Sequence, residues 1–308
     1  MNKLQIYTHP SAFAHDTGAG HPESIARIQS VMSVFDDAPF DALPMMKARA
    51  ATMAELTRAH PLSYIQKLQD SLPFDDDYAF IDGDTVLCPT SLDAATHAAG
   101  AVCQAVDDIA TGQTQHAFCA MRPPGHHAMP EQAMGFCFYN NIFIGARHAQ
   151  AAHNIAKIAI IDFDVHHGNG TDFMARKAEN IFYISSHQSP LFPGTGDPAE
   201  NIDGQILNIN FDAGTSSETF RATYKSTVFP ALHAFAPDLI MISAGFDAHK
   251  NDPIGGMKLT DDDFGWATSE IAKIANQYCG GRIISVLEGG YDLHALKTAT
   301  TAHLSALL

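Results

Sequence analysis

A largely apolar run at residues 157–161 leads directly into the segment DFDVHHGNGT at residues 162–171. Such a run predicts a buried strand, so the segment places polar side chains where that strand ends. Asp164 and His166 lie two positions apart and therefore point to the same side of an extended chain. A carboxylate oxygen and an imidazole nitrogen both suit zinc. The pair predicts two ligands of one divalent cation, with a third ligand contributed from elsewhere.

Two further apolar runs, at residues 237–247 and 283–292, also end in polar side chains that could bind a metal or a substrate. The first closes on Asp247, and the second passes through a glycine pair to Tyr291. In open parallel sheets, ligands bind outside the carboxyl ends of the strands. We therefore expect Asp247 and Tyr291 to face the same crevice as the first pair.

A fourth polar segment, RPPGHHA at residues 122–128, follows the apolar stretch 117–121. Two prolines and a glycine fix a loop that ends in His126 and His127. Histidine is the side chain whose unperturbed pKa best suits proton transfer near neutral pH. With a tyrosine hydroxyl that can polarise a carbonyl opposite the metal, these residues predict a hydrolytic site.

Strand-like apolar runs alternate with helical stretches along the chain. This alternation predicts an α/β fold, an open parallel sheet of about eight strands with helices on both faces. The strand-like runs are residues 4–7, 117–121, 157–163, 181–185, 206–210, 239–244 and 283–287, and the helical stretches are 91–110, 142–152, 217–235, 262–278 and 293–307. No low-complexity linker divides the chain, so residues 1–308 are expected to form a single domain. Loops 8–23 and 72–90 are expected to form the rim of the site.

The charge of the chain restricts its partners only weakly. With 18 basic and 34 acidic residues the formal net charge is −16, which argues against direct binding of nucleic acid and suits basic peptides or polyamines. No apolar stretch approaches the roughly 20 residues of a membrane span, and the first residues lack a signal-peptide pattern. We therefore expect a cytoplasmic protein without a membrane contact. Five widely spaced cysteines predict neither a disulfide framework nor a thiolate zinc site.

Ordered segments through most of the chain resemble the zinc-dependent histone deacetylase family of the arginase/deacetylase superfamily. They are HPE at 21–23 with Arg27, the His126–His127 loop, GFCFYNN at 135–141, DFDVHHGNGT at 162–171, FPGTG at 192–196, SAGFD at 243–247 with DP at 252–253, and LEGGYD at 287–292. Asn169 and the LEGGY sequence are similar to the class II versions of these motifs. We expect a bacterial member, for which histones would not be the natural substrate.

The resemblance implies that Asp164, His166 and Asp247 bind Zn²⁺. Three protein ligands leave an open coordination position for water and the substrate carbonyl, as a catalytic zinc requires. The resemblance also implies a K⁺ site that uses the side chains of Asp162 and Ser185 together with nearby backbone oxygens.

Further roles follow from the resemblance at the two histidines. His127 matches the general base that later acts as general acid, and Asn169 would orient it as a neutral partner, which stabilises an imidazolium less than a carboxylate would. His126 would be held by Asp162. The implied reaction is hydrolysis of an acetamide by an activated water, with the metal and the Tyr291 hydroxyl stabilising the oxyanion.

The resemblance implies a narrow apolar tunnel for a linear amine chain. Phe136 and Phe192 match its walls, and Gly135 matches the residue whose carbonyl accepts the substrate amide hydrogen. Asp84 and Ile254 match rim positions that select substrates. A carboxylate at position 254 would favour a cationic acetylpolyamine, and isoleucine removes that signal. The expected substrate is acetyl-lysine in a protein or peptide, with an acetylated polyamine as the alternative, and a homo-oligomer is compatible with the sequence.

The sequence argues against three other functions. An arginase-like hydrolase with paired metals would need further carboxylates where the chain has Gly168 and His249. A nucleotide-binding dehydrogenase would need a G-x-G-x-x-G turn directly after a strand, which the chain lacks. A non-catalytic acyl-lysine binding module is disfavoured because the ligands, both histidines and Tyr291 are all retained.

Overall fold

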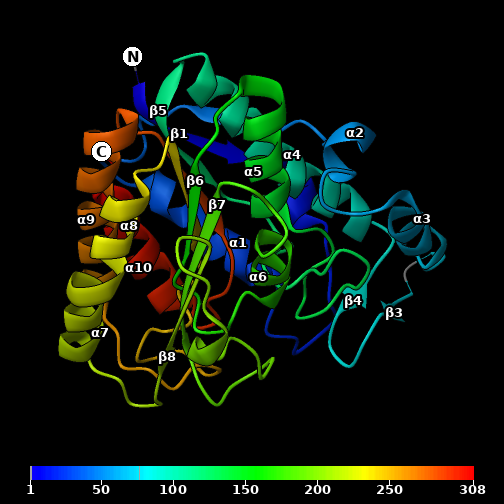
Figure 1. The fold of residues 1–308 in the computed structure, drawn as a ribbon. Coiled ribbons are helices and arrows are strands. Elements are labelled where there is room, and N and C mark those ends of the chain that lie inside the picture. The colour runs from blue at the N-terminus through cyan, green and yellow to red at the C-terminus, as the bar shows by residue number, and fades with distance from the viewer. Residues whose placement is uncertain (1, 76) are drawn as a thin grey trace.

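The computed structural model describes residues 2–75 and 77–308, and in them one sheet of eight parallel strands forms the centre of the molecule (Figure 1). In spatial order the strands are β2 (Met45–Lys47), β1 (Asn2–Thr8), β5 (Thr114–Cys119), β10 (Ile283–Leu287), β9 (Leu239–Ala244), β6 (Ile158–Asp162), β7 (Ile181–Gln188) and β8 (Ile206–Phe211). Each neighbouring pair is parallel. The predicted α/β architecture with about eight strands is confirmed.

Helices cover both faces of this sheet. Figure 1 shows α4 and α5 on one side and α7, α8, α9 and α10 on the other. The helices are α1 (Ile25–Met32), α2 (Met53–Leu56), α3 (Leu62–Asp70), α4 (Ser91–Ala110), α5 (Asn141–His153), α6 (Asn169–Ala175), α7 (Ser217–Thr223), α8 (Phe229–Phe235), α9 (Asp261–Cys279) and α10 (Leu293–Ser305), with short 3₁₀ segments at η1 (Pro10–Phe13), η2 (Ser33–Asp36) and η3 (Pro198–Glu200). Among the described residues, every helix is too short or too polar to cross a lipid bilayer.

The central strands are the best predicted elements because both of their faces are covered. Every residue of β6, β9 and β10 is buried, so each strand appears in the sequence as a predominantly apolar run rather than as an alternation of apolar and polar residues. In the register of the sheet, Asp162 at the end of β6 lies beside Ser185 of β7 and Ser243 of β9. The carboxyl ends of these strands therefore bring their following loops together at one edge.

Two predicted elements differ in detail from the structure. The strand expected at 117–121 spans Thr114–Cys119, because Thr114 and His116 pair with β1 despite their polar side chains. The helix expected at 217–235 is interrupted by a π-helical turn, η4 (Tyr224–Val228), between α7 and α8. Pro230 follows directly in α8 and has no N–H to donate to the preceding turn, which favours this local widening.

Several elements were not predicted. The expected rim loop at 72–90 contains a short hairpin of β3 (Ala79–Phe80) and β4 (Val86–Leu87), and the edge strand β2 and the helices α1, α2, α3 and α6 were also missed. β2 is only three residues long and half-exposed, so it carries no apolar periodicity that could reveal it.

Candidate active site

Three side chains converge beyond the carboxyl ends of β6 and β9. The Nδ1 atom of His166 lies 3.1 Å from Oδ1 of Asp164 and 3.1 Å from Oδ2 of Asp247. One donor atom from each residue lies within 4.8 Å of the others, and all three residues are buried. The structure thus brings together the residues predicted as zinc ligands.

The electrostatics of this cluster fit a cation. Burial and the adjacent Asp164 carboxylate raise the pKa of Asp247 to about 7. Burial alone would lower the pKa of His166, but its hydrogen bonds to the two carboxylates raise it to about 10. Two carboxylates this close repel each other when both are ionised, so the cluster favours a positive charge between them. One nitrogen and two carboxylate oxygen ligands form a donor set that suits Zn²⁺.

Glycines allow the two carboxylates to come this close to the backbone. A Cβ atom at Gly289 would lie 2.2 Å from Oδ2 of Asp247, and a Cβ atom at Gly245 would lie 2.0 Å from Oδ2 of Asp164. The N–H of Gly289 also donates a hydrogen bond of 2.8 Å to Oδ2 of Asp164. The glycine at position 289 is therefore part of the site.

The adjacent histidines His126 and His127 lie beside this cluster and have different partners. Nδ1 of His126 lies 3.0 Å from Oδ2 of Asp162, the last residue of β6. Nδ1 of His127 lies 2.8 Å from Oδ1 of Asn169, the first residue of α6. Both predicted pairings are therefore present in the structure.

These environments shift the two pKa values in opposite directions. Burial alone would lower the pKa of His126, but the carboxylates of Asp162 and Asp164 raise it well above its ordinary value. Burial and the neighbouring imidazoles of His126 and His166 lower the pKa of His127 well below its ordinary value. His127 is therefore the imidazole that stays neutral, which is the form that a general base requires.

Tyr291 lies directly after the glycine pair at the end of β10. The guanidinium carbon of Arg27 lies 4.9 Å from the centroid of its ring, and the ring of Phe136 approaches it edge to face with centroids 6.0 Å apart. Burial raises the pKa of Tyr291 well above its ordinary value. The hydroxyl therefore keeps its proton and can donate a hydrogen bond.

A cavity of about 280 Å³ opens over these groups. Its lining includes His126, His127, His166 and Tyr291 together with all five residues predicted to bind substrate, namely Asp84, Gly135, Phe136, Phe192 and Ile254. Pro22, Pro124 and Gly289 complete the lining and had been given no role. The ring of Phe192 packs edge to face on His127, with centroids 5.1 Å apart, so an aromatic wall adjoins the candidate base.

Part of this wall has an unusual backbone. Gly135 and Phe136 both adopt positive φ, at 56° and 69°. A Cβ atom at Gly135 would lie 2.4 Å from Cδ2 of His127, so only glycine leaves room for that imidazole. A left-handed phenylalanine is uncommon and costs energy that the surrounding contacts must offset. The N–H of Phe136 donates to Oγ1 of Thr85, which holds it there.

The residues predicted to bind K⁺ lie side by side on β6 and β7. The Asp162 carboxylate accepts hydrogen bonds from the Asp164 N–H at 3.1 Å and the Tyr183 hydroxyl at 2.9 Å. Oγ of Ser185 lies 2.9 Å from Nδ1 of His187. Their polar atoms already have protein partners, and the K⁺ site stays a prediction.

A buried group of ion pairs lies beside the site and contacts the backbone that precedes Tyr291. The sequence did not predict a role for this group. Glu23 accepts hydrogen bonds from Nη1 of Arg27 at 2.9 Å and from Nη2 of Arg122 at 2.6 Å. Arg27 in turn donates to the backbone oxygens of Glu288 and Gly290, the second at 2.6 Å. The group therefore holds the segment that leads to Tyr291. The HPE segment with Arg27 is one of the motifs that carry the family resemblance. Its contacts could not be predicted because its partners are distant in sequence.

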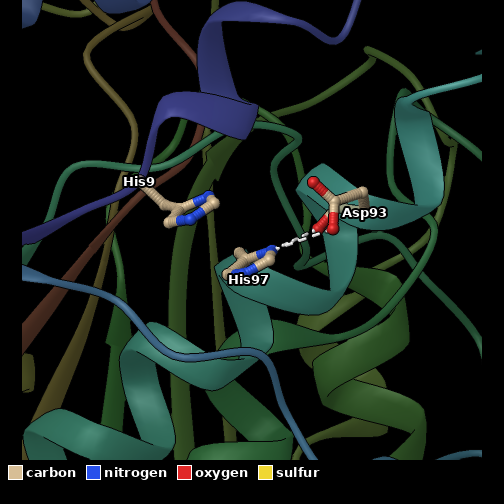
Figure 2. A group of neighbouring side chains, drawn as sticks. All are labelled: His9, Asp93 and His97. Carbon is tan, nitrogen blue, oxygen red and sulfur yellow. Dashed lines mark hydrogen bonds and ion pairs between the residues drawn. The ribbon is translucent and has the colours of Figure 1, made fainter.

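A second group of potential metal ligands lies elsewhere on the molecule, between the loop after β1 and the helix α4 (Figure 2). The rings of His9 and His97 stack with centroids 3.6 Å apart and an angle of 2° between their planes. Nδ1 of His97 lies 3.3 Å from Oδ1 of Asp93, an exposed helical neighbour one turn away. Parallel rings hold their lone pairs in separate planes, and a single ion cannot lie in both. The group is a stacked surface pair rather than a preformed metal site.

The chain is similar to several known proteins along most of its length. Residues 21–307 match the family model described as "Histone deacetylase domain". Type-2 histone deacetylase 2 of Dictyostelium discoideum is 35% identical over 357 residues, which cover 99% of this chain but only 21% of that protein. The histone deacetylase-like amidohydrolase of Pseudomonas aeruginosa is 35% identical over 89% of this chain and 73% of its own length. The crystal structure of the HDA15 HD domain matches with a TM-score of 0.92 and 31% identity, over 99% of this chain and 88% of that one.

Proposed function

Because the chain belongs to the histone deacetylase family, we propose that it is a zinc-dependent amidohydrolase that removes acetyl groups from N-acetyl-lysine in proteins or peptides. The observation that carries this proposal is one cavity whose lining includes His166, the neutral His127 and Tyr291. Phe136 and Phe192 line the same cavity, and aromatic walls suit the methylene chain of a lysine because they bury it without requiring hydrogen bonds.

Asp164, His166 and Asp247 would hold the metal. Zinc at this position supplies Lewis acidity, which polarises an amide carbonyl and lowers the pKa of water. The proton transfers are assigned to side chains of this protein. The hydrogen bond between His127 and Asn169 determines which nitrogen of His127 can accept a proton. With Nδ1 of His127 facing the amide oxygen of Asn169, the Nδ1 position carries the proton and Nε2 is left as the acceptor.

In the proposed reaction, Nε2 of His127 takes a proton from water as the water oxygen attacks the acetamide carbon. The Tyr291 hydroxyl donates a hydrogen bond to the carbonyl oxygen as that oxygen becomes negative. The bond between the carbonyl carbon and the lysine nitrogen then breaks, and the proton held by His127 passes to the leaving amine. Acetate and a free lysine side chain are the products.

An acetylated polyamine is the second candidate substrate, and the mouth of the cavity supplies the observation that favours it. Asp84 lines the cavity, and burial together with the nearby Asp82 carboxylate raises the pKa of Asp84. The carboxylate of Asp84, with that of Asp82 close to it, would attract a cation. Ile254, on the same rim, offers no further charge for that cation, so acetyl-lysine is preferred.

Acetate release from an acetyl-lysine peptide and from acetylputrescine, measured side by side with zinc-loaded protein, tests the proposal. We expect peptide turnover, and its loss in an Asp247→Ala variant that no longer retains metal. Preference for acetylputrescine would move the function to polyamine deacetylation. Tight binding of the peptide without turnover would instead support an acyl-lysine binding module.

A further inference from the structure

The carboxylate of Asp252 joins two segments that are separate in sequence. Its Oδ2 atom accepts hydrogen bonds from the N–H groups of Tyr291 at 2.7 Å and Asp292 at 3.2 Å. Its Oδ1 atom accepts from the N–H groups of Ile254 at 2.9 Å and Gly255 at 3.4 Å. Asp252 itself is buried. The Asp252 side chain therefore links the turn that carries the rim residue Ile254 to the backbone of Tyr291, the candidate oxyanion donor.

The residues that precede Tyr291 do not fix its position, so hydrogen bonds to its backbone are needed to do so. Gly289 and Gly290 come directly before it, and Gly290 adopts a φ of 122°, a region that other residues rarely enter. Glycines have the most conformational freedom of all residues, so this pair does not by itself fix where the tyrosine lies. Arg27 bonds the backbone oxygen of Gly290 on one side. Asp252 holds the next N–H groups on the other.

We propose that Asp252 is a positioning residue that holds the Tyr291 hydroxyl where it can stabilise the oxyanion, and that it couples this hydroxyl to Ile254 at the rim. The inference rests on the proposed function, because it takes the oxyanion role of Tyr291 as given. Misplacement of a catalytic group by about 1 Å can cost on the order of 10²-fold in rate, so a carboxylate that never touches substrate can still control turnover.

An Asp252→Asn variant separates the two pairs of hydrogen bonds. Asparagine has the same shape but a single acceptor oxygen, and its NH₂ group would face two N–H donors. The bonds to Ile254 and Gly255 are local and form the turn that Asx side chains favour. We therefore expect the amide oxygen to keep the local pair and release the N–H groups of Tyr291 and Asp292.

The kinetic test is a double-mutant cycle with Tyr291→Phe on an acetyl-lysine peptide. Asp252→Asn alone should lower kcat by roughly 10- to 100-fold with little change in KM, because the hydroxyl acts mainly in the transition state. In the Tyr291→Phe background the same change should cost less than about twofold, since no hydroxyl is left to misplace. Asp41→Asn, in the exposed segment before β2, removes one charge outside both segments and should behave as the wild type.

Equal losses in both backgrounds would overturn the inference, because they would show an effect that bypasses Tyr291. Bound zinc is measured in each variant, and a loss confined to metal content would overturn it as well. Asp252→Ser, whose hydroxyl can still accept from the local turn, is a second variant with the same expectations should the asparagine protein be unstable.

Crystal structures of the wild type and of Asp252→Asn test the inference without relying on activity. We expect a displaced Tyr291 ring in the variant, and an unmoved ring would overturn the inference. An inactive wild-type protein would count against the proposed function alone, so the two failures are distinguishable.

Discussion

The amide oxygen of Asn169 lies 2.8 Å from Nδ1 of His127, the imidazole that we propose as the general base. The partner is neutral, whereas the neighbouring His126 faces the carboxylate of Asp162. A neutral partner fixes the orientation of an imidazole and stabilises its cation less than a carboxylate would. The two adjacent histidines therefore have the same ring but different proton affinities, and their different partners add to the effects of burial and of the neighbouring charged groups.

An Asn169→Asp variant should shift the pH dependence of kcat/KM. A carboxylate beside Nδ1 raises the pKa of His127 from its lowered value. The base works only when neutral, so activity is lost as the pH falls through this pKa, and a higher pKa moves that loss to higher pH. A bound cation would lower the pKa in wild type and variant alike, which leaves the sign unchanged. An acid limb at the same pH in both proteins would contradict the proposed role of His127.

A Tyr291→Phe variant should lose kcat while keeping its metal. Removal of one oxyanion donor typically costs about 10²–10³-fold in kcat, and the phenyl ring can still pack against Arg27 and Phe136. Acetate release and bound zinc are measured on the same samples. Tyr278→Phe, whose hydroxyl contacts His233 far from the cavity, is the matched control and should retain normal turnover. A near-normal rate for Tyr291→Phe would remove this residue from the mechanism.

A Gly289→Ala variant should bind metal poorly. The added methyl group would lie 2.2 Å from Oδ2 of Asp247 and 2.6 Å from Oδ2 of Asp164, so at least one carboxylate must move. Disturbing the groups that orient metal ligands typically costs about 10–100-fold in affinity. Competition with a metal-binding dye measures the change. In Gly83→Ala the methyl group would meet no heavy atom within 4 Å, so affinity should stay at the wild-type level. Equal affinities of the two variants would contradict the geometry of the site.

A Glu23→Gln variant should be strongly destabilised. The carboxylate of Glu23 is fully buried between the guanidinium groups of Arg27 and Arg122, and the loss of its charge leaves two buried cations unpaired. Breaking a buried ion pair in this way costs about 3–5 kcal/mol in the free energy of unfolding. Urea denaturation measures it. Glu200→Gln removes an exposed partner of Arg176 at 3.7 Å and should change the free energy of unfolding by less than about 0.5 kcal/mol. Comparable effects of the two substitutions would refute this interpretation of the buried group.

The sequence alone predicted the fold well where strands are buried on both faces. β6, β9 and β10 are predominantly apolar runs, and each one leads into a polar motif at its carboxyl end. Because parallel strands end at the same edge, the sequence alone places these motifs together. The short strands β2, β3 and β4 could not be found, since two or three residues carry no measurable periodicity.

The supporting contacts of the site were beyond sequence reasoning for a different reason. Asp252 and Tyr291 are 39 residues apart, and Glu23 and Arg122 are 99 residues apart. Local patterns such as spacing and periodicity show which residues share a face of one element. They do not predict which backbone N–H or guanidinium group, distant in sequence, will bind a given buried carboxylate. The candidate ligands were predictable, but the groups that hold them were not.

Titration of metal-free protein with zinc, with acetate release followed at each step, tests the central claim most directly. Asp164, His166 and Asp247 form one cluster of ligands, so the account predicts that activity rises in proportion to added zinc and reaches its plateau at one equivalent per chain. The Asp247→Ala protein should stay inactive throughout. Full activity of the chelator-treated protein, or a plateau that requires two equivalents, would contradict a single catalytic zinc held by these three residues.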